Sequence, residues 1–156
     1  MRTILVLNPK GGSGKTTLAT NIASYFSIKN KKVTLADCDP QASSQDWLNL
    51  RSDKQSSIYK AVLTQSNLKV SKDTDILIMD TPAGVTDKRL SKFLSQAQTM
   101  IMPVIASPID IRAAEHFIEK LFSLKTAINH KIKIATVANR VREDTLIAAK
   151  LEYYLD

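Results

Sequence analysis

Short apolar runs alternate along the chain with segments in which apolar residues recur every three or four positions. The runs have the length of strands, and the periodic segments have the spacing of amphipathic helices. Such alternation is typical of an α/β protein, with a mainly parallel sheet and helices on both faces. The predicted strands are residues 4–7, 33–36, 76–79, 100–104 and 132–138. The predicted helices are residues 16–28, 43–50, 88–97, 110–128 and 145–155.

Residues 51–74 are polar and interrupt this alternation. Ile58, Ala61 and Val62 form a small apolar cluster at helical spacing, so we expect a short helix and a surface loop, without an assigned function. No repeat or linker divides the 156 residues. A chain of this length predicts one domain that buries about 70% of its unfolded surface.

The segment from Asn8 to Thr17 reads Asn-Pro-Lys-Gly-Gly-Ser-Gly-Lys-Thr-Thr and follows the first predicted strand. A strand, a glycine-rich turn and a helix start bring backbone N–H groups and the positive end of the helix dipole around a triphosphate. We expect Lys15 to reach the β- and γ-phosphates and Thr16 to bind Mg²⁺. The fold class is therefore a P-loop NTPase. The residues expected around the nucleotide phosphates are Lys10, Gly11, Gly12, Ser13, Gly14, Lys15, Thr16 and Thr17.

Two further predicted strands end in acidic residues. Asp80 follows the apolar run 76–79, and Asp37 and Asp39 follow the run 33–36. The carboxyl ends of parallel strands meet at one edge of the sheet, where ligands bind. A carboxylate ending an apolar strand is costly unless it is paired or lies near a metal. Asp80 fits the Walker B position and would act on Mg²⁺ through a water; an ordinary strand-to-loop turn is the alternative.

The cysteine, the histidines and the apolar runs of the sequence do not indicate a disulfide, a zinc site or a membrane span. Cys38 is the single cysteine, which excludes an internal disulfide, and we expect it to be a small buried filler. His116 and His130 have no second ligand at zinc spacing. No apolar run is long enough to span a bilayer, and we expect a cytoplasmic, nucleoid-associated protein. The net charge of +7 suits an anionic partner such as DNA.

One departure from the ordinary phosphate loop is informative. Pro9 stands where that motif has its first glycine, and Lys10-Gly11-Gly12 follows. This variant resembles the deviant Walker A box of the ParA/MinD family of ATPases. The resemblance implies that Lys10 crosses to the nucleotide of a second subunit in an ATP-sandwich dimer. The alternative is a monomeric P-loop protein in which Lys10 is a solvated charge.

The resemblance extends to both segments that follow the acidic strand ends. Asp37-Cys38-Asp39-Pro40-Gln41 resembles the family's first switch, and Thr81-Pro82-Ala83-Gly84 resembles its second, which senses the γ-phosphate. This implies that Asp39 orients the attacking water and that Asp37 supports the metal shell. The implied catalytic residues are Lys10, Lys15 and Asp39, and the implied Mg²⁺ ligands are Thr16, Asp37 and Asp80.

The expected nucleotide is ATP. The guanine-reading element Asn-Lys-x-Asp of GTPases does not occur in the sequence. Asn139-Arg140 follows the last predicted strand, similar to where the ParA family places an asparagine that contacts adenine. The resemblance therefore implies that Asn139 and Arg140 belong to the base site, whereas a plain strand-end turn is the alternative.

The segments around Trp47 and Ala138-Asn139-Arg140-Val141 look like the small, stand-alone partition ATPases. This resemblance implies an ATP-dependent homodimer, nonspecific binding of duplex DNA, slow hydrolysis, and a ParB-like or cargo adaptor partner. Family members normally continue into another strand and closing helices, whereas this sequence stops at Asp156, so we expect one domain, 1–156, lacking those elements. Arg112, Arg140 and Arg142 are the expected DNA contacts. The alternatives are a MinD-like membrane ATPase and a biosynthetic enzyme of the cobyrinate or dethiobiotin type.

Overall fold

The computed structural model describes residues 1–63, 68–124 and 131–155. Six parallel strands form the main sheet in the order β3-β2-β6-β1-β7-β8. These strands are β1 (Arg2–Val6), β2 (Val33–Asp37), β3 (Ile58–Lys60), β6 (Ile76–Asp80), β7 (Thr99–Ile105) and β8 (Lys133–Asn139). The described helices are α1 (Lys15–Ile28), α2 (Ser43–Asn49), α3 (Asp87–Gln96), α4 (Pro108–Ser123) and α6 (Leu146–Leu155).

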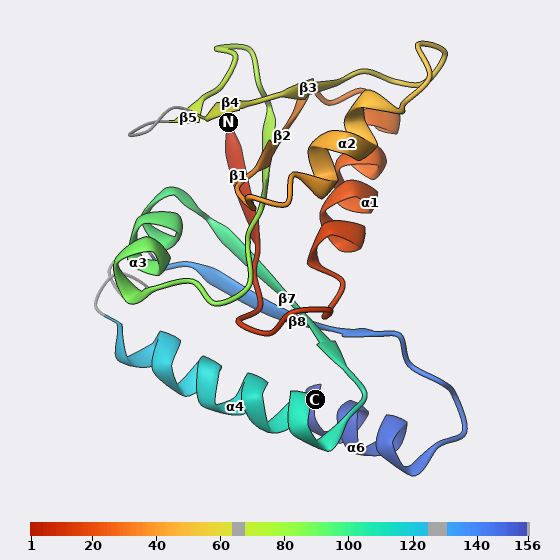
Figure 1. Cartoon of the computed structure of the whole chain (residues 1–156), viewed down its shortest axis with the longest axis vertical. Helices are drawn as coiled ribbons and strands as arrows, with labels where there is room; N and C mark the ends of the chain where they lie inside the picture. Colours follow the sequence, from red (N-terminus) through yellow and green to blue (C-terminus); the bar gives the residue numbers. More distant parts are fainter. Residues whose placement is uncertain (64–67, 125–130, 156) are drawn as a thin grey trace.

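Helices cover both faces of the sheet, with α1 and α2 on one face and α3, α4 and α6 on the other (Figure 1). Side chains of a strand alternate between the faces, so β1 contributes to two separate cores. Ile4 and Val6 pack with Ala19 and Ala23 of α1. Leu5 packs in the second core, to which α3, α4 and α6 contribute. The predicted three-layer α/β architecture is confirmed.

The predicted elements of the main alternation are present, with ends that differ by a few residues. The largest difference concerns the predicted helix 110–128, which begins at Pro108 and for which the structure describes helix up to Ser123. Residues 125–130 of that prediction lie outside the described residues. Pro108 is favourable in the first helical turn because its missing N–H needs no partner there.

The short helix expected in residues 51–74 is wrong for the part of this segment that the structure describes, whereas residues 51–57 form the expected surface loop. Ile58 belongs to the edge strand β3, which pairs with β2 through Val33 and Ile58. Two short strands, β4 (Val62–Leu63) and β5 (Leu68–Lys69), pair as an antiparallel hairpin. The free edge of β2 offers backbone partners to this segment, and that pairing outweighs the weak helical spacing of a few apolar residues.

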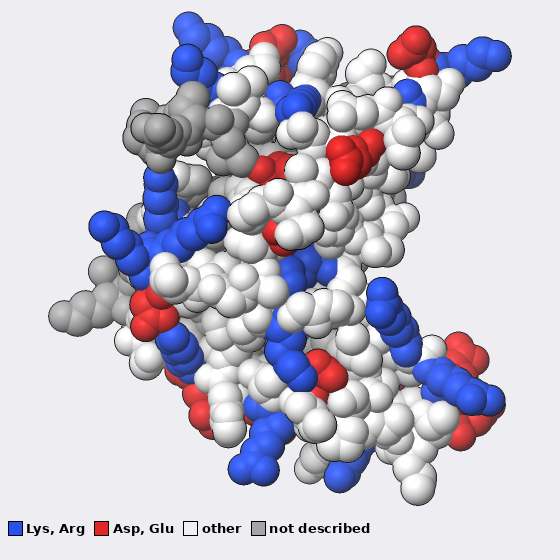
Figure 2. Space-filling model, in the orientation of Figure 1, with Lys and Arg blue, Asp and Glu red and all other residues white. Residues whose placement is uncertain are grey.

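The surface carries both signs of charge. Lys and Arg side chains are spread over the face seen in Figure 2, with Asp and Glu side chains among them. Among the described residues, no helix combines the length and apolar character needed to cross a membrane.

Candidate functional site

The phosphate loop joins β1 to α1 at the carboxyl edge of the sheet. Gly12 and Gly14 have φ angles of 75° and 89°, which favour glycine. Gly14 is the residue that precedes α1, and the first turn of α1 contains no acidic side chain. The positive end of the helix dipole is therefore not neutralised from within the helix, as an anion-binding loop requires.

Both lysines of the loop have partners within the protomer. The Lys15 ammonium donates a hydrogen bond to the backbone carbonyl of Lys10 at 2.9 Å. Burial lowers the pKa of Lys15, and the nearby carboxylates of Asp80 and Asp39 partly offset this effect. The Lys10 ammonium lies 3.1 Å from a carboxylate oxygen of Asp110, at the start of α4. The Lys15 ammonium thus contacts the loop itself, whereas the Lys10 ammonium contacts α4.

The strand ends that face the loop belong to β2 and β6. Asp37 and Asp80 are paired neighbours in the register of these two strands. The N–H of Cys38 donates to the carbonyl of Asp80 at 2.8 Å, which continues the pairing beyond β2. The sheet therefore brings together the acidic residues that the sequence placed after separate apolar runs.

Asp80 is the most deeply buried of these carboxylates, with 1% of the residue exposed. The pKa of Asp80 is raised to about 6, chiefly by burial and also by Asp37, whereas Thr16, Ser44 and Lys15 act to lower it. No described residue makes a hydrogen bond of normal geometry to either carboxylate oxygen, although the Thr16 and Ser44 hydroxyls lie nearby. An unpartnered buried carboxylate beside a threonine hydroxyl fits a hydrated Mg²⁺.

Asp37 and Asp39 have their oxygens engaged by backbone groups. One oxygen of Asp37 accepts the N–H of Asp39 at 3.0 Å, and the other accepts the N–H of Gln45 in α2 at 2.9 Å. Asp39 in turn accepts the N–H of Gln41 at 2.9 Å. Asp37 therefore ties the end of β2 to the first turn of α2, and Asp39 stays partly exposed near Lys15.

Asn139 contacts the phosphate loop from the end of β8. Its side-chain amide donates to the carbonyl of Ser13 at 2.8 Å, and its oxygen accepts the N–H of Arg140 at 3.0 Å. A Cβ on Gly14 would lie 2.1 Å from the Asn139 amide nitrogen. Glycine is thus required at position 14 both by its backbone angle and by this close approach. Arg140 itself is exposed.

The segment after β6 also touches the loop. The N–H of Gly84 donates to the carbonyl of Pro9 at 3.0 Å, and the Thr81 hydroxyl donates to the carbonyl of Val6 at 2.9 Å. Arg89 of α3 donates to the carbonyl of Cys38 at 2.9 Å. The segment that resembles the second switch is therefore joined to the phosphate loop through Gly84 and Pro9, and α3, which follows it, contacts the segment that resembles the first switch.

Two residues of this region were missed by the sequence analysis. Ser44 lies fully buried beside Asp80, and no local pattern distinguishes it from other helix residues. Asp110 belongs to Ser107-Pro108-Ile109-Asp110, a pattern typical of a helix start. That pattern indicates a capping role, whereas the contact of the Asp110 carboxylate with Lys10 depends on the fold.

The side chains of Cys38 and His116 take no part in this arrangement. Burial raises the pKa of Cys38 to about 12, so its thiol stays protonated, and its predicted burial is confirmed. His116 is exposed on α4, and His130 lies outside the described residues. Within 1–63, 68–124 and 131–155, no three His, Cys, Asp or Glu side chains are grouped as metal ligands.

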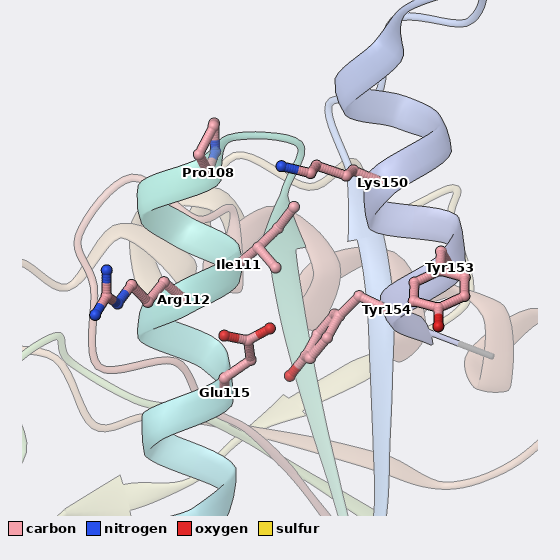
Figure 3. Close-up of a pocket in the computed structure, with 7 residues that line it drawn as sticks. All are labelled: Pro108, Ile111, Arg112, Glu115, Lys150, Tyr153 and Tyr154. Carbon is pink, nitrogen blue, oxygen red and sulfur yellow. The ribbon is translucent and has the colours of Figure 1, made fainter.

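A separate hollow of about 600 Å³ lies between α4 and α6. Glu115 and Tyr154 point toward each other across it, whereas Arg112 extends from α4 away from both tyrosines (Figure 3). Burial and Glu115 raise the pKa of Tyr154. The hollow is lined by Pro108, Ile111, Arg112, Glu115, Lys150, Tyr153 and Tyr154, none of which belongs to the phosphate loop.

A glycine-rich loop after the first strand, faced by carboxylates at the neighbouring strand ends, defines the class of P-loop nucleotide-binding proteins. The family model described as the CobQ/CobB/MinD/ParA nucleotide binding domain matches residues 4–155. The chain therefore belongs to this family, and the suspected relation to ParA/MinD ATPases is confirmed.

Named relatives lie within the partition branch of the family. The chain is 31% identical over 145 residues to the maintenance of carboxysome distribution protein A of Halothiobacillus neapolitanus, covering 88% of the chain and 66% of the relative. It is 28% identical over 146 residues to protein ParA of Rhizobium radiobacter, covering 90% and 65%. The chain thus spans about two thirds of the length of these relatives.

Solved structures share the fold. Cobyrinic acid a,c-diamide synthase from Mycobacterium smegmatis, crystallised with ADP and magnesium, superposes with a TM-score of 0.76 at 17% identity. The match covers 98% of this chain and 80% of that one. This likeness shows that the two proteins share the fold.

Proposed function

We propose that this chain binds ATP and Mg²⁺, forms an ATP-sandwich dimer, and uses slow hydrolysis to position plasmid, chromosomal or protein cargo on DNA. The observation that carries the proposal is the place of Lys10. It belongs to the phosphate loop, yet its ammonium pairs with Asp110 of α4, and 35% of its side chain is exposed. A cation there is accessible to the nucleotide of a second protomer.

The hydrolytic step follows from the arrangement of the strand ends. Lys15 exchanges the Lys10 carbonyl for phosphate oxygens, and Asp39 orients a water in line with the γ-phosphorus. The new bond joins that water oxygen to phosphorus, and the bond to the β–γ bridging oxygen breaks, so ADP leaves. Thr16 and Asp80 would hold Mg²⁺, with Asp37 fixing the neighbouring segment, and the ion would supply positive charge to the phosphate groups.

The base site is the second part of this proposal. Asn139 and Arg140 stand at the end of β8, next to Ser13 of the loop. We place the adenine beside them, since the guanine-reading tetrapeptide does not occur in the sequence.

Oligomeric state with ATP tests the proposal. The wild-type protein and the variant Lys10→Ala are compared by analytical ultracentrifugation with a non-hydrolysable ATP analogue, with ADP, and without nucleotide. The wild type should dimerise with the analogue alone. Lys10→Ala should remain monomeric while its nucleotide affinity changes little, because Lys15 supplies the contact within the protomer.

Lys54→Ala is the matched control, since Lys54 is an exposed lysine of the loop between α2 and β3. It should dimerise like the wild type. Normal dimerisation of Lys10→Ala would refute the sandwich and, with it, the proposed function.

DNA binding is tested separately with random duplex DNA. The net charge of +7 favours phosphate contacts, and the exposed residues Arg112, Arg140 and Arg142 are the first to replace. Binding should require ATP and should not depend on the DNA sequence. The logarithm of the affinity should fall linearly with the logarithm of the salt concentration. The partner expected to stimulate hydrolysis is a ParB-like or cargo adaptor protein.

A second candidate function follows from the family description, which includes CobQ and CobB. A biosynthetic enzyme of that type would use ATP to activate a small carboxylate substrate. It would show no DNA-stimulated or DNA-retained dimer, and its turnover would depend on the substrate. An ATP-dependent dimer that binds duplex DNA therefore separates the two candidates.

A further inference from the structure

We propose that Asp110 holds Lys10 inside the free protomer and competes with a partner's triphosphate for it. The Lys10–Asp110 ion pair then sets how readily the protein dimerises. This inference rests on the proposed function, in which Lys10 crosses to a second subunit.

The ion pair links two distant parts of the chain. The Lys10 ammonium and the Asp110 carboxylate are 3.1 Å apart, and their side chains are 35% and 19% exposed. The same residue, Lys10, supplies the carbonyl that accepts the Lys15 ammonium at 2.9 Å. In the free protomer both loop lysines are therefore satisfied by groups that a bound nucleotide or a second subunit would replace.

Asp110 is held in place by the first turn of α4. Its N–H and that of Ile111 donate to the carbonyl of Ser107 at 3.1 Å and 2.9 Å. Ile111 and Ala114 are buried against the sheet, and Figure 3 shows Ile111 and Glu115 on the side of α4 that faces α6. The packing of α4 thus fixes the backbone from which the Asp110 carboxylate meets the phosphate loop.

Asp110 also lies in the first turn of α4. A carboxylate in the first turn of a helix is stabilised by the helix dipole. The Ser107 hydroxyl makes no side-chain cap, and the Asp110 carboxylate pairs with Lys10. The carboxylate is therefore a defined resting partner for Lys10 and is not a solvated charge beside it.

The ion pair must open before Lys10 can reach a neighbouring subunit. A partly exposed ion pair contributes little stability, so its effect on dimerisation is about two- to five-fold. Salt weakens such a pair by screening. The Lys10–Asp110 ion pair therefore opposes dimerisation weakly, and the binding of ATP and of a second protomer together offsets it.

The first test compares dimer dissociation constants of the wild type and Asp110→Asn with a non-hydrolysable ATP analogue. The variant should dimerise at about two- to five-fold lower concentration at low salt, and the difference should shrink at about 0.5 M salt. Asp87→Asn is the matched control, because Asp87 is also a first-turn aspartate, of α3, paired with a lysine, Lys120. It should leave dimerisation unchanged.

A second measurement follows Lys10 in the monomer. The rate of acetylation of the Lys10 amine, measured by mass spectrometry with ADP present, should rise at least about two-fold in Asp110→Asn and stay unchanged in Asp87→Asn. Thermal melting of both variants verifies that they fold.

The outcomes distinguish this inference from the function on which it rests. If Lys10→Ala stays monomeric but Asp110→Asn dimerises no more tightly than the wild type, only the role of Asp110 is refuted. Weaker dimerisation of Asp110→Asn would instead show that Asp110 supports Lys10 within the dimer. Normal dimerisation of Lys10→Ala overturns both proposals.

Discussion

The central strands β1 and β6 and the edge strand β8 lie in one sheet but differ greatly in how deeply their residues are buried. All five residues of β6 are buried, as are four of the five of β1, whereas no residue of β8 is. Helices pack on both faces of the central strands. The phosphate loop and Asp80 therefore extend from a rigid support, whereas Asn139 reaches the loop from the more exposed strand.

This difference separates two ways of positioning a site residue. Asp80 is placed by strand pairing and packing on either side, and its own carboxylate contributes no hydrogen bond of normal geometry. Asn139 is placed by the hydrogen bond that it makes to Ser13. We expect substitutions near the central strands to change stability, and substitutions at the end of β8 to change mainly the nucleotide site.

The largest expected effect is a loss of stability when a valine is shortened to alanine in a central strand, compared with the same substitution in β8. Val6→Ala in β1 removes two methyl groups from a fully buried position and should lower the free energy of unfolding by about 2–4 kcal/mol. Val137→Ala in β8 should cost less than about 1 kcal/mol, since Val137 is 36% exposed. Urea unfolding without nucleotide measures both, and equal losses would contradict the comparison.

An intermediate effect is expected at Asp80, with a defined pH dependence. Its pKa of about 6 in the fold exceeds the ordinary 3.8, so the folded state binds more protons between these values. The free energy of unfolding attributable to this group therefore falls as pH rises through that window. Asp80→Asn removes the buried charge and should stabilise the metal-free protein at pH 7.5 by about 1–3 kcal/mol.

The gain should shrink as pH falls and disappear well below pH 3.8, where Asp80 is protonated in both states. Urea unfolding in EDTA across this pH range measures it. Asp53→Asn, in an exposed loop, is the control and should follow the wild-type curve. A variant that is destabilised at pH 7.5 would show that the Asp80 carboxylate has a partner in the metal-free protein.

The smallest expected effect concerns Asn139. Asn139→Ala removes the donor to the Ser13 carbonyl and should cost about 0.5–1.5 kcal/mol, equivalent to a loss of nucleotide affinity of up to about ten-fold. Calorimetric titration with the ATP analogue measures the affinity. Arg142→Ala, a substitution of an exposed residue past the end of β8, should leave it unchanged. Equal affinities for Asn139→Ala and the wild type would remove Asn139 from the site.

The sequence by itself determined the α/β class, the phosphate loop and the strand ends that carry Asp37 and Asp80. These features depend on local periodicity and on residue types that a glycine-rich turn or a buried strand requires. These features can be predicted from the sequence because the residues that cause each of them lie within a few positions of one another in the chain.

Only the tertiary structure decided the path of residues 58–63, the burial of Ser44 beside Asp80, and the contacts of Asp110 and Asn139 with the loop. Asp110 meets Lys10, and Asn139 meets Ser13, across at least 100 positions of the chain. Such contacts depend on the order in which the strands pair and on how the helices pack. Local patterns in a single sequence do not reveal that order.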